Sequence, residues 1–209
     1  MDRLDQLAPP NTVYRVWADT ERAASLRSSR RYAASWELRV RALELARALG
    51  DPAALAVAAY ALVGGGYGRP VEWPQRLAVA HEVAPLTERP ADECSRLLFS
   101  NLFDLFLSAG RREAAEEQLG RFERYIERSG DARAGIYAPY RRARLAALDG
   151  RFVEALALGE TLVEAGEELG SPVAGRTAAS QARLWPLVQV GRAEQALQEL
   201  PLAAPALPC

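Results

Sequence analysis

The chain has 209 residues, of which 49% are hydrophobic, and its formal net charge is −1. This length is enough for one large domain. Every one of its 26 basic residues other than histidine is an arginine, which excludes chemistry that depends on a lysine amine. A net charge close to zero provides no cationic field for a phosphate backbone, so we expect no direct nucleic-acid partner.

The composition also limits the cellular compartment. The N-terminus lacks the apolar core of a signal peptide, and the longest weakly polar run, 53–66, is too short to cross a bilayer. Only two cysteines are present, Cys94 and Cys209, which fits a reducing compartment without structural disulfides. We therefore expect a cytoplasmic protein without a membrane partner, and the absence of lysine indicates a GC-rich bacterial genome.

Apolar residues at helical spacing predict helices along most of the chain, after a flexible lead-in at 1–11. In the second predicted helix, for example, Trp36, Val40, Leu43, Ala46 and Leu49 step by three and four. On the first helix, Val13, Val16, Trp17, Ala24 and Leu26 form the expected packing side. The predicted helices are 13–28, 31–49, 52–63, 74–83, 94–109, 111–129, 131–149, 151–169, 171–190 and 192–200, followed by a disordered tail at 201–209.

Two of these helices are expected to be deeply packed. The helix at 52–63 is rich in alanine, which permits close approach of neighbours on both sides, and 94–109 is apolar around most of its circumference.

Pro139 and Pro186 lie inside predicted helices, where proline removes a backbone hydrogen bond and favours a kink. Pro85 is expected to end the helix at 74–83.

A short phrase returns along the chain and marks a repeat. Gly-Arg followed within a few residues by Glu and then Ala begins at Gly110, Gly150 and Gly191, and looser copies lie near residues 30 and 68, so the spacing is about 40 residues. Halfway between them, Gly50, Gly130 and Gly170 precede Asp or Ser, a combination typical of a helix end and a new helix cap. The pattern predicts an all-α solenoid of about five antiparallel helix pairs, over 12–200.

The Gly-Arg-Phe-x-Glu-Ala-Leu phrase at 150–156, with Gly-Asp-Pro at 50–52, resembles tetratricopeptide (TPR) repeats. Together with 42–56 and 141–158, it is similar to the TPR-like helical region of large ATP-binding LuxR-type transcriptional regulators and related signalling proteins. That resemblance implies a right-handed superhelix with a recognition role in bacterial regulation. The chain lacks a phosphate-binding loop and a basic helix-turn-helix, so ATPase activity and DNA binding are not implied.

The resemblance also implies a binding groove, because the first helix of each TPR pair lines the concave surface. Positions 40 or 41 residues apart then form stripes across neighbouring helices. The candidate groove residues are Ser100, Tyr140 and Gln181 in one stripe, Asp104, Arg144 and Trp185 in the next, with Asn101 and Tyr137 alongside. The alternative is that Tyr137, Tyr140 and Trp185 are packing residues between helices.

Other chemistry-bearing residues favour structural roles. The glycine loop at 64–68 follows no strand and precedes no lysine, so it is expected to be an inter-helix loop. His81 is the only histidine, and Cys94 has no histidine near it in the sequence, so neither indicates catalysis or metal binding. Arg141, Arg142 and Arg144 form the densest basic cluster, expected to be solvated, with a phosphate-contacting patch as the alternative.

The sequence therefore predicts a non-enzymatic module without cofactor, metal or catalytic residues, which binds a protein segment or a small effector. The alternative is a structural oligomerisation module. The last predicted repeat is truncated after 200, so apolar residues at 197–202 could stack on another copy or on a further domain.

Overall fold

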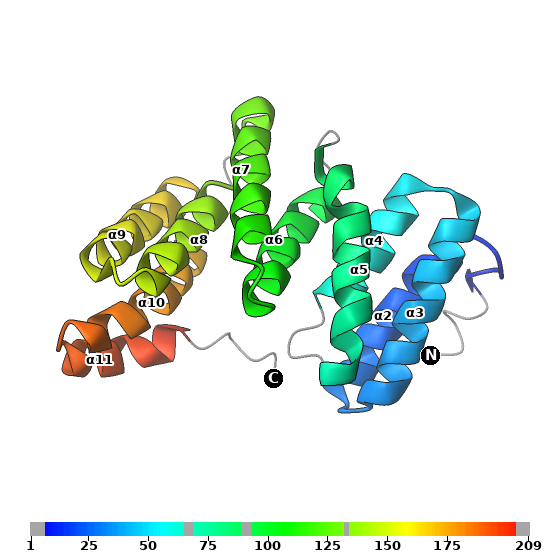
Figure 1. Cartoon of the computed structure of the whole chain (residues 1–209), viewed down its shortest axis with the longest axis horizontal. Helices are drawn as coiled ribbons and strands as arrows, with labels where there is room; N and C mark the ends of the chain where they lie inside the picture. Colours follow the sequence, from blue (N-terminus) through cyan, green and yellow to red (C-terminus); the bar gives the residue numbers. More distant parts are fainter. Residues whose placement is uncertain (1–6, 65–68, 89–92, 132–133, 204–209) are drawn as a thin grey trace. The chain divides into compact units, whose positions relative to one another are not determined.

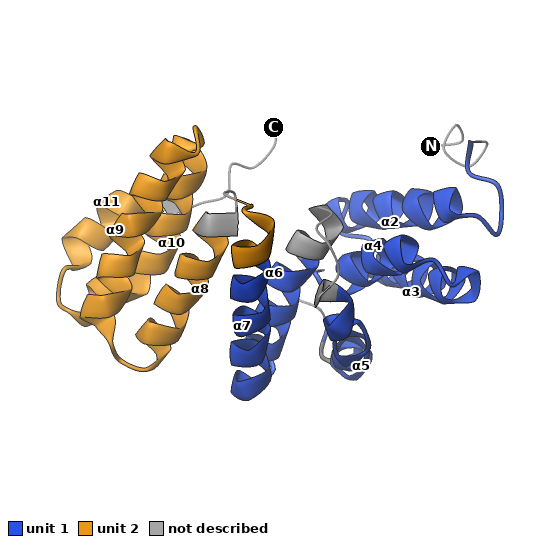
Figure 2. Cartoon of the chain, turned by 90° about the horizontal axis from the view of Figure 1, so that it is seen from above, with its two compact units in different colours: residues 1–125 blue, residues 126–209 orange. Residues whose placement is uncertain are grey.

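The structure is a computed structural model that describes residues 7–64, 69–88, 93–131 and 134–203. Within these ranges the chain is all-helical, with ten α-helices, two short 3-10 helices and no strand (Figure 1). It divides into two compact units, residues 1–125 and 126–209, with the boundary inside one helix (Figure 2). Each unit is described by itself.

The helix bounds agree closely with the prediction. Unit 1 contains α2 (Val13–Ser28), α3 (Tyr32–Leu49), α4 (Pro52–Val63), η1 (Pro70–Glu72), α5 (Trp73–Val83), η2 (Ala84–Glu88), α6 (Glu93–Ser108) and most of α7 (Arg112–Ser129). Unit 2 contains the end of α7 and α8 (Ala134–Leu148), α9 (Phe152–Glu168), α10 (Pro172–Gln189) and α11 (Ala193–Ala203).

Helix α4 lies at the centre of the packing in unit 1, where it contacts α2, α3, α5 and α6. Its alanines Ala54, Ala58 and Ala59 are completely buried. Because an alanine side chain is a single methyl group, neighbouring helices can approach α4 closely on more than one side. The expectation of a deeply packed helix at 52–63 is confirmed.

Helix α6 supplies the aromatic core of unit 1. The ring of Phe99 lies 5.1 Å from that of Phe122 and 5.5 Å from that of Tyr125, which joins α6 to α7. Phe103 and Phe106 are also buried. Large rings at contact distance bury more apolar area than aliphatic residues can, so this cluster stabilises unit 1 strongly.

The buried faces of α2 and α3 differ from the predicted ones. On α3 the buried residues are Ser35, Arg39, Ala42, Leu43 and Ala46, whereas Trp36, Val40 and Leu49 are half-buried. On α2 the prediction of Trp17 and Ala24 as packing residues is wrong, since both are exposed and Asp19, Thr20 and Ala23 are buried instead. Successive side chains along a helix differ in direction by about 100°. A buried face that lies one position from the predicted one therefore includes Arg39 in place of Val40 on α3.

In unit 2 the helices α8, α9, α10 and α11 pack consecutively, and α10 also contacts α8. The core combines Ile136 and Ala143 of α8, Leu162 of α9, and Ala179 and Ala182 of α10. At one point α9 and α10 meet through glycine on both sides. A Cβ atom added to Gly175 would lie 2.6 Å from the carbonyl oxygen of Leu162 and 2.7 Å from the Cα of Gly166.

The Gly-Arg phrase corresponds to one hydrogen-bonded turn, found after α6, α8 and α10. Arg30-Arg31 after α2 and Gly170-Ser171 after α9 form the same turn, so it occurs five times. In the turn after α8, Arg151 N–H donates to the Ala146 carbonyl at 2.8 Å, and Gly150 N–H donates to that of Ala147 at 3.1 Å. The Arg151 carbonyl then accepts from Ala155 N–H at 3.0 Å. One residue therefore closes a Schellman motif and caps the next helix, which explains why the phrase recurs.

The residue before the new cap has a positive φ in all five turns. It is glycine at Gly110, Gly150, Gly170 and Gly191, and φ is 58° at Arg30, which takes the glycine's place after α2. Gly50 and Gly130 have the same conformation at the other predicted helix ends. The predicted helix boundaries at these six glycines are confirmed.

We expect Arg30→Gly to stabilise the protein by about 0.5–1 kcal/mol, because arginine is strained at positive φ and glycine is not. In a thermal denaturation followed by circular dichroism, this corresponds to a rise in Tm of about 1–4 °C. The converse control is Gly150→Ala, which should lose about 1 kcal/mol. An added Cβ there has no atom within 4 Å, so only backbone strain acts. A lower Tm for Arg30→Gly would contradict this account of the turn.

The ends of the chain also differ in detail from the prediction. Helix α11 continues to Ala203, past Pro201, where a helix end was expected. Within the predicted lead-in, Ala8 is buried and the Thr12 hydroxyl donates to the Pro9 carbonyl at 2.8 Å. Pro139 and Pro186 lie inside α8 and α10 as expected. Residues 1–6 and 204–209 lie outside the described residues.

Candidate functional site

The predicted groove residues fall into two groups, one in each unit. Ser100, Asn101 and Asp104 lie on α6 in unit 1, and all three are half-buried. The Asn101 amide packs against the end of α4, where a Cβ added to Gly64 would lie 2.1 Å from its Nδ2 atom. Asn101 therefore occupies space that any side chain at position 64 would need.

In unit 2 the structure brings the α8 residues together. The guanidinium carbon of Arg144 lies 5.8 Å from the centre of the Tyr140 ring. Arg141, which was not among the predicted groove residues, lies 5.8 Å from the ring centres of both Tyr137 and Tyr140. We call Tyr137, Tyr140, Arg141 and Arg144 the arginine–tyrosine array. Cation–π contacts of this kind hold the rings and the guanidinium groups in fixed relative positions.

Two members of the array have partly structural roles. Tyr140 packs against the unit 2 core, in line with the alternative that it is a packing residue. Arg141 is only 3% exposed, and its Nη1 donates to the Tyr137 carbonyl at 3.1 Å. The expectation of a solvated cluster is therefore wrong for Arg141. Arg144 is half-buried and Arg142 is exposed.

The remaining predicted residues, Gln181 and Trp185, lie on α10, which packs on α8. Both are exposed, and the exposed fraction of Trp185 is 58%. An indole that leaves more than half of its surface in water contributes little to the core of the unit. Such a side chain is available for contact with another molecule.

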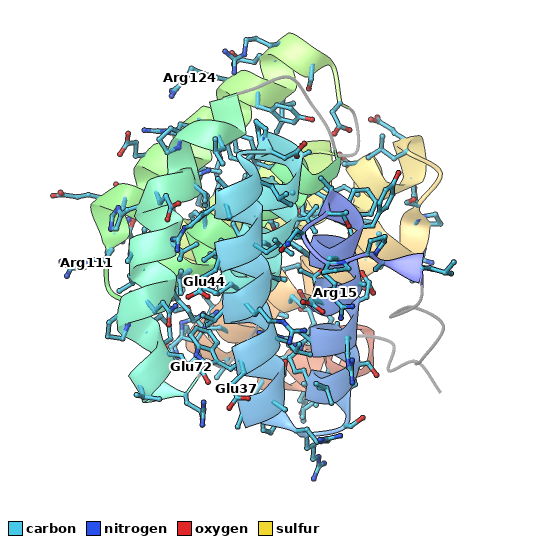
Figure 3. All side chains as sticks on the ribbon, turned by 90° about the vertical axis from the view of Figure 1, so that its right-hand side faces the viewer. Arg15, Glu37, Glu44, Glu72, Arg111 and Arg124 are labelled. Atoms are coloured by element: carbon cyan, nitrogen blue, oxygen red, sulfur yellow. The ribbon has the colours of Figure 1, made fainter. Side chains whose placement is uncertain are left out.

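Unit 1 contains a buried charge cluster that sequence reasoning missed. Asp19 of α2 is 1% exposed and accepts from Arg15 and Arg41, with Nη2 to Oδ1 distances of 2.8 and 2.9 Å. Arg15 of α2 and Glu44 of α3, labelled in Figure 3, line the same surface pocket as Asp19. Because Arg41 belongs to α3, the carboxylate links the two helices. The only signal in the sequence is an aspartate on the apolar side of α2.

A second buried charge in unit 1 is Arg39, which lies between Ser35 and Leu43 on the packed side of α3. It is 7% exposed, and its Nε atom is buried without a hydrogen-bond partner. A further buried cation, Arg76 of α5, acts electrostatically on Arg39; it is 3% exposed, donates to the Val63 carbonyl and lies over the Trp73 ring at 5.3 Å. In the sequence, the burial of Arg39 is indicated only by its position four residues before Leu43, at the spacing of the apolar stripe of this helix.

The described residues provide no constellation for catalysis that we can identify. Among them no group of three or more His, Cys, Asp or Glu side chains could hold a metal ion. The exposed His81 packs its ring against Phe106 at 5.0 Å. The side chain of Cys94 and the loop residues 65–68 lie outside the described part of the chain. No helix in that part is long and apolar enough to cross a membrane.

Comparison of the chain with models of protein families, with curated proteins and with solved structures found no match. The class that the fold defines is therefore an all-helical protein of two compact units. Any role for it has to be argued from its own residues.

Proposed function

We propose that this chain is a non-enzymatic recognition module that binds a protein segment or a small effector in bacterial regulation. The proposal includes a TPR-like solenoid of about five helix pairs, with a period of about 40 residues and a right-handed superhelix. Support for the repeat comes from the turns at 30–31, 110–111, 150–151 and 191–192, which share one hydrogen-bond pattern and follow α2, α6, α8 and α10. The same turn also follows α9, half a period from its neighbours. The regulatory setting rests on the resemblance in sequence, and the cytoplasmic setting rests on the N-terminal sequence and the cysteine usage.

The observation that carries the proposal is the exposed indole of Trp185 on α10, which packs against α8, the helix that carries the arginine–tyrosine array. Tryptophan, tyrosine and arginine are the residues most enriched at energetically important positions of protein interfaces. Rings and guanidinium groups that are already held in place lose little conformational freedom when they bind a partner. A segment with aromatic and acidic side chains matches this face best.

A binding experiment with the full-length chain tests the proposal. The wild-type protein is used to capture partners from an extract of its source cells, and the affinity for the captured partner is then measured by calorimetry. We expect Trp185→Ala to weaken binding by about 30-fold and Arg144→Glu by about tenfold, as for interface residues of these types. Trp185 is mostly exposed, so its removal should leave the Tm almost unchanged.

Arg176→Glu is the matched control. Arg176 is exposed, lies on the same helix as Trp185, and is nine residues away, which places it on the opposite side of α10. The charge change equals that of Arg144→Glu, and binding should not change. If Trp185→Ala and Arg144→Glu bind as the wild type does, recognition through this face is refuted.

The second candidate function is self-assembly through α11. Leu197 and Leu200 of this helix are 69% and 54% exposed, an arrangement typical of an apolar surface that another chain covers. In that case the molar mass measured by light scattering should fall on dilution, and Leu197→Glu should abolish the larger species. A recognition module that acts through α8 and α10 should instead have the same mass at all concentrations without its partner.

A further inference from the structure

A pocket of about 260 Å³ opens between α2, α3 and α4 in unit 1. Thr20, Glu21 and Arg27 of α2, Arg39 of α3, and Tyr60 and Gly64 of α4 line it, together with small apolar residues. Glu21 and Arg27 are exposed, whereas Arg39 is 93% buried, corresponding to its exposed fraction of 7%. The pocket therefore reaches from solvent to a guanidinium group inside the unit.

Nothing in the described part of the chain neutralises Arg39. Its guanidinium makes no hydrogen bond or ion pair with any described residue, and its Nε atom is buried. The buried Glu72, whose charge acts on Arg39, is 8% exposed and already binds Arg69, whose Nε donates to Oε1 at 2.7 Å and whose backbone N–H donates to Oε2 at 3.1 Å. A buried cation without a partner is costly, so such a group is rarely kept for stability alone.

The charges around Arg39 increase this cost. Burial and the neighbouring cations Arg27 and Arg76 lower the pKa of Arg39 to about 10, against a smaller opposing effect of Glu72. At neutral pH the group therefore remains protonated, and the repulsion from Arg27 and Arg76 acts on it together with its burial. An anion in the pocket would relieve this repulsion, and a guanidinium can hold two oxygen atoms of one oxyanion at the same time.

We propose that this pocket binds the phosphate group of a small molecule, with Arg39 as its buried ion-pair partner and Arg27 at its mouth. A phosphate monoester is close to a dianion at neutral pH and so matches two guanidinium groups better than a carboxylate does. Tyr60 and Thr20 line the same pocket and offer hydroxyl groups for hydrogen bonds. The exposed Glu21 disfavours anions, but its charge is screened by solvent far more than that of Arg39.

Inorganic phosphate is the probe for the test. Thermal denaturation of the full chain is recorded at constant ionic strength, with chloride replaced stepwise by phosphate, sulfate or acetate. For wild type, a phosphate concentration of ten times Kd should raise the Tm by about 3–5 °C. Sulfate should act similarly and acetate clearly less. No phosphate-dependent rise, or an equal rise with acetate, would overturn the assignment.

Arg39→Met identifies the site, because methionine fills similar space without the charge. Without anion this variant should have a Tm about 2–5 °C above that of wild type, since it removes an unpaired buried charge. Its Tm should no longer respond to phosphate. Arg47→Met, on the exposed side of the same helix, changes the net charge equally and should keep the full response. A full response in Arg39→Met would show adventitious binding elsewhere and overturn the proposal.

Arg27→Met keeps the proposal testable if Arg39→Met fails to fold. The Arg27 side chain is exposed and makes no hydrogen bond or ion pair with any described residue, so its replacement should not affect folding. We expect phosphate to bind this variant about three- to tenfold more weakly, because one of the two cations is lost. Unchanged phosphate affinity in Arg27→Met would remove the charge complementarity on which the proposal depends.

Discussion

Gly175→Ala is expected to lower the stability of the protein by about 2–4 kcal/mol, although alanine is the better helix former. The added methyl group would lie 2.6 Å from the Leu162 carbonyl oxygen and 2.7 Å from the Gly166 Cα, and both atoms belong to the backbone of α9. Backbone atoms cannot rotate away, so α9 and α10 would have to separate. The gain in helix propensity of about 1 kcal/mol does not offset the packing lost in that movement.

Urea and thermal denaturation followed by circular dichroism measure this effect, with an expected fall in Tm of about 5–12 °C. Gly159→Ala is the matched control on the same pair of helices. Its added Cβ would meet Cγ and Cδ of Arg183 at 2.4 and 2.6 Å, and the nearest backbone atom, the Ala179 oxygen, at 3.7 Å. The Arg183 side chain would have to shift at these atoms, and it is ion-paired with Glu199 at 3.0 Å, so this change should also destabilise the protein. The loss should be smaller than for Gly175→Ala, because no backbone atom has to move. Equal stability of Gly175→Ala and wild type would contradict the close helix contact.

Asp19→Ala is expected to cost about 3 kcal/mol, because it removes the one carboxylate that holds two arginines between α2 and α3. Arg15 contacts Asp19 Oδ1 through Nε and Nη2 at 3.1 and 2.8 Å, and Arg41 donates to Oδ2 and Oδ1 at 3.0 and 2.9 Å. Without the carboxylate, the 18% exposed Arg15 side chain would be left partly buried beside a second cation. The Arg41 side chain is 58% exposed and can be hydrated when the carboxylate is removed. The expected loss of stability is therefore near the lower end of the range for breaking a buried ion pair.

Arg41→Met separates the buried carboxylate from the exposed arginine. It leaves Asp19 paired with Arg15, so we expect a loss of only about 1 kcal/mol in the same denaturation experiment. Asp19→Asn should fall between the two, because the amide keeps the shape and one acceptor oxygen but not the charge. If Asp19→Ala lowers the free energy of unfolding by no more than Arg41→Met does, the buried carboxylate does not stabilise the contact between α2 and α3 as proposed.

The helices and the turns between them could be predicted from the sequence because both depend on neighbouring residues. The helix at 52–63 was predicted with the observed bounds, and the six boundary glycines adopt the left-handed conformation that their position required. The repeat, the solenoid and its handedness concern the arrangement of many helices, and they remain part of the proposal.

The candidate site was less accessible to sequence reasoning. Tyr137, Tyr140 and Arg144 do lie together on α8, as their helical spacing indicates. Arg141 was missed as a member of the array. From the sequence, an arginine next to Arg142 is expected to be solvated, and only the packing of the neighbouring helices shows that Arg141 is buried. Whether the α6 residues and the α8 residues serve one groove remains a prediction.

By itself, the sequence determined that this chain is helical and where most of its helices begin and end, because glycine at positive φ, capping and apolar periodicity act within a few residues. Only the tertiary structure decided which polar groups are buried. Asp19, Arg39 and Arg141 face the interior because contacts with other helices set the rotation of each helix about its axis. Those rotations placed one carboxylate between two arginines and left one guanidinium facing a pocket without a partner in the described residues.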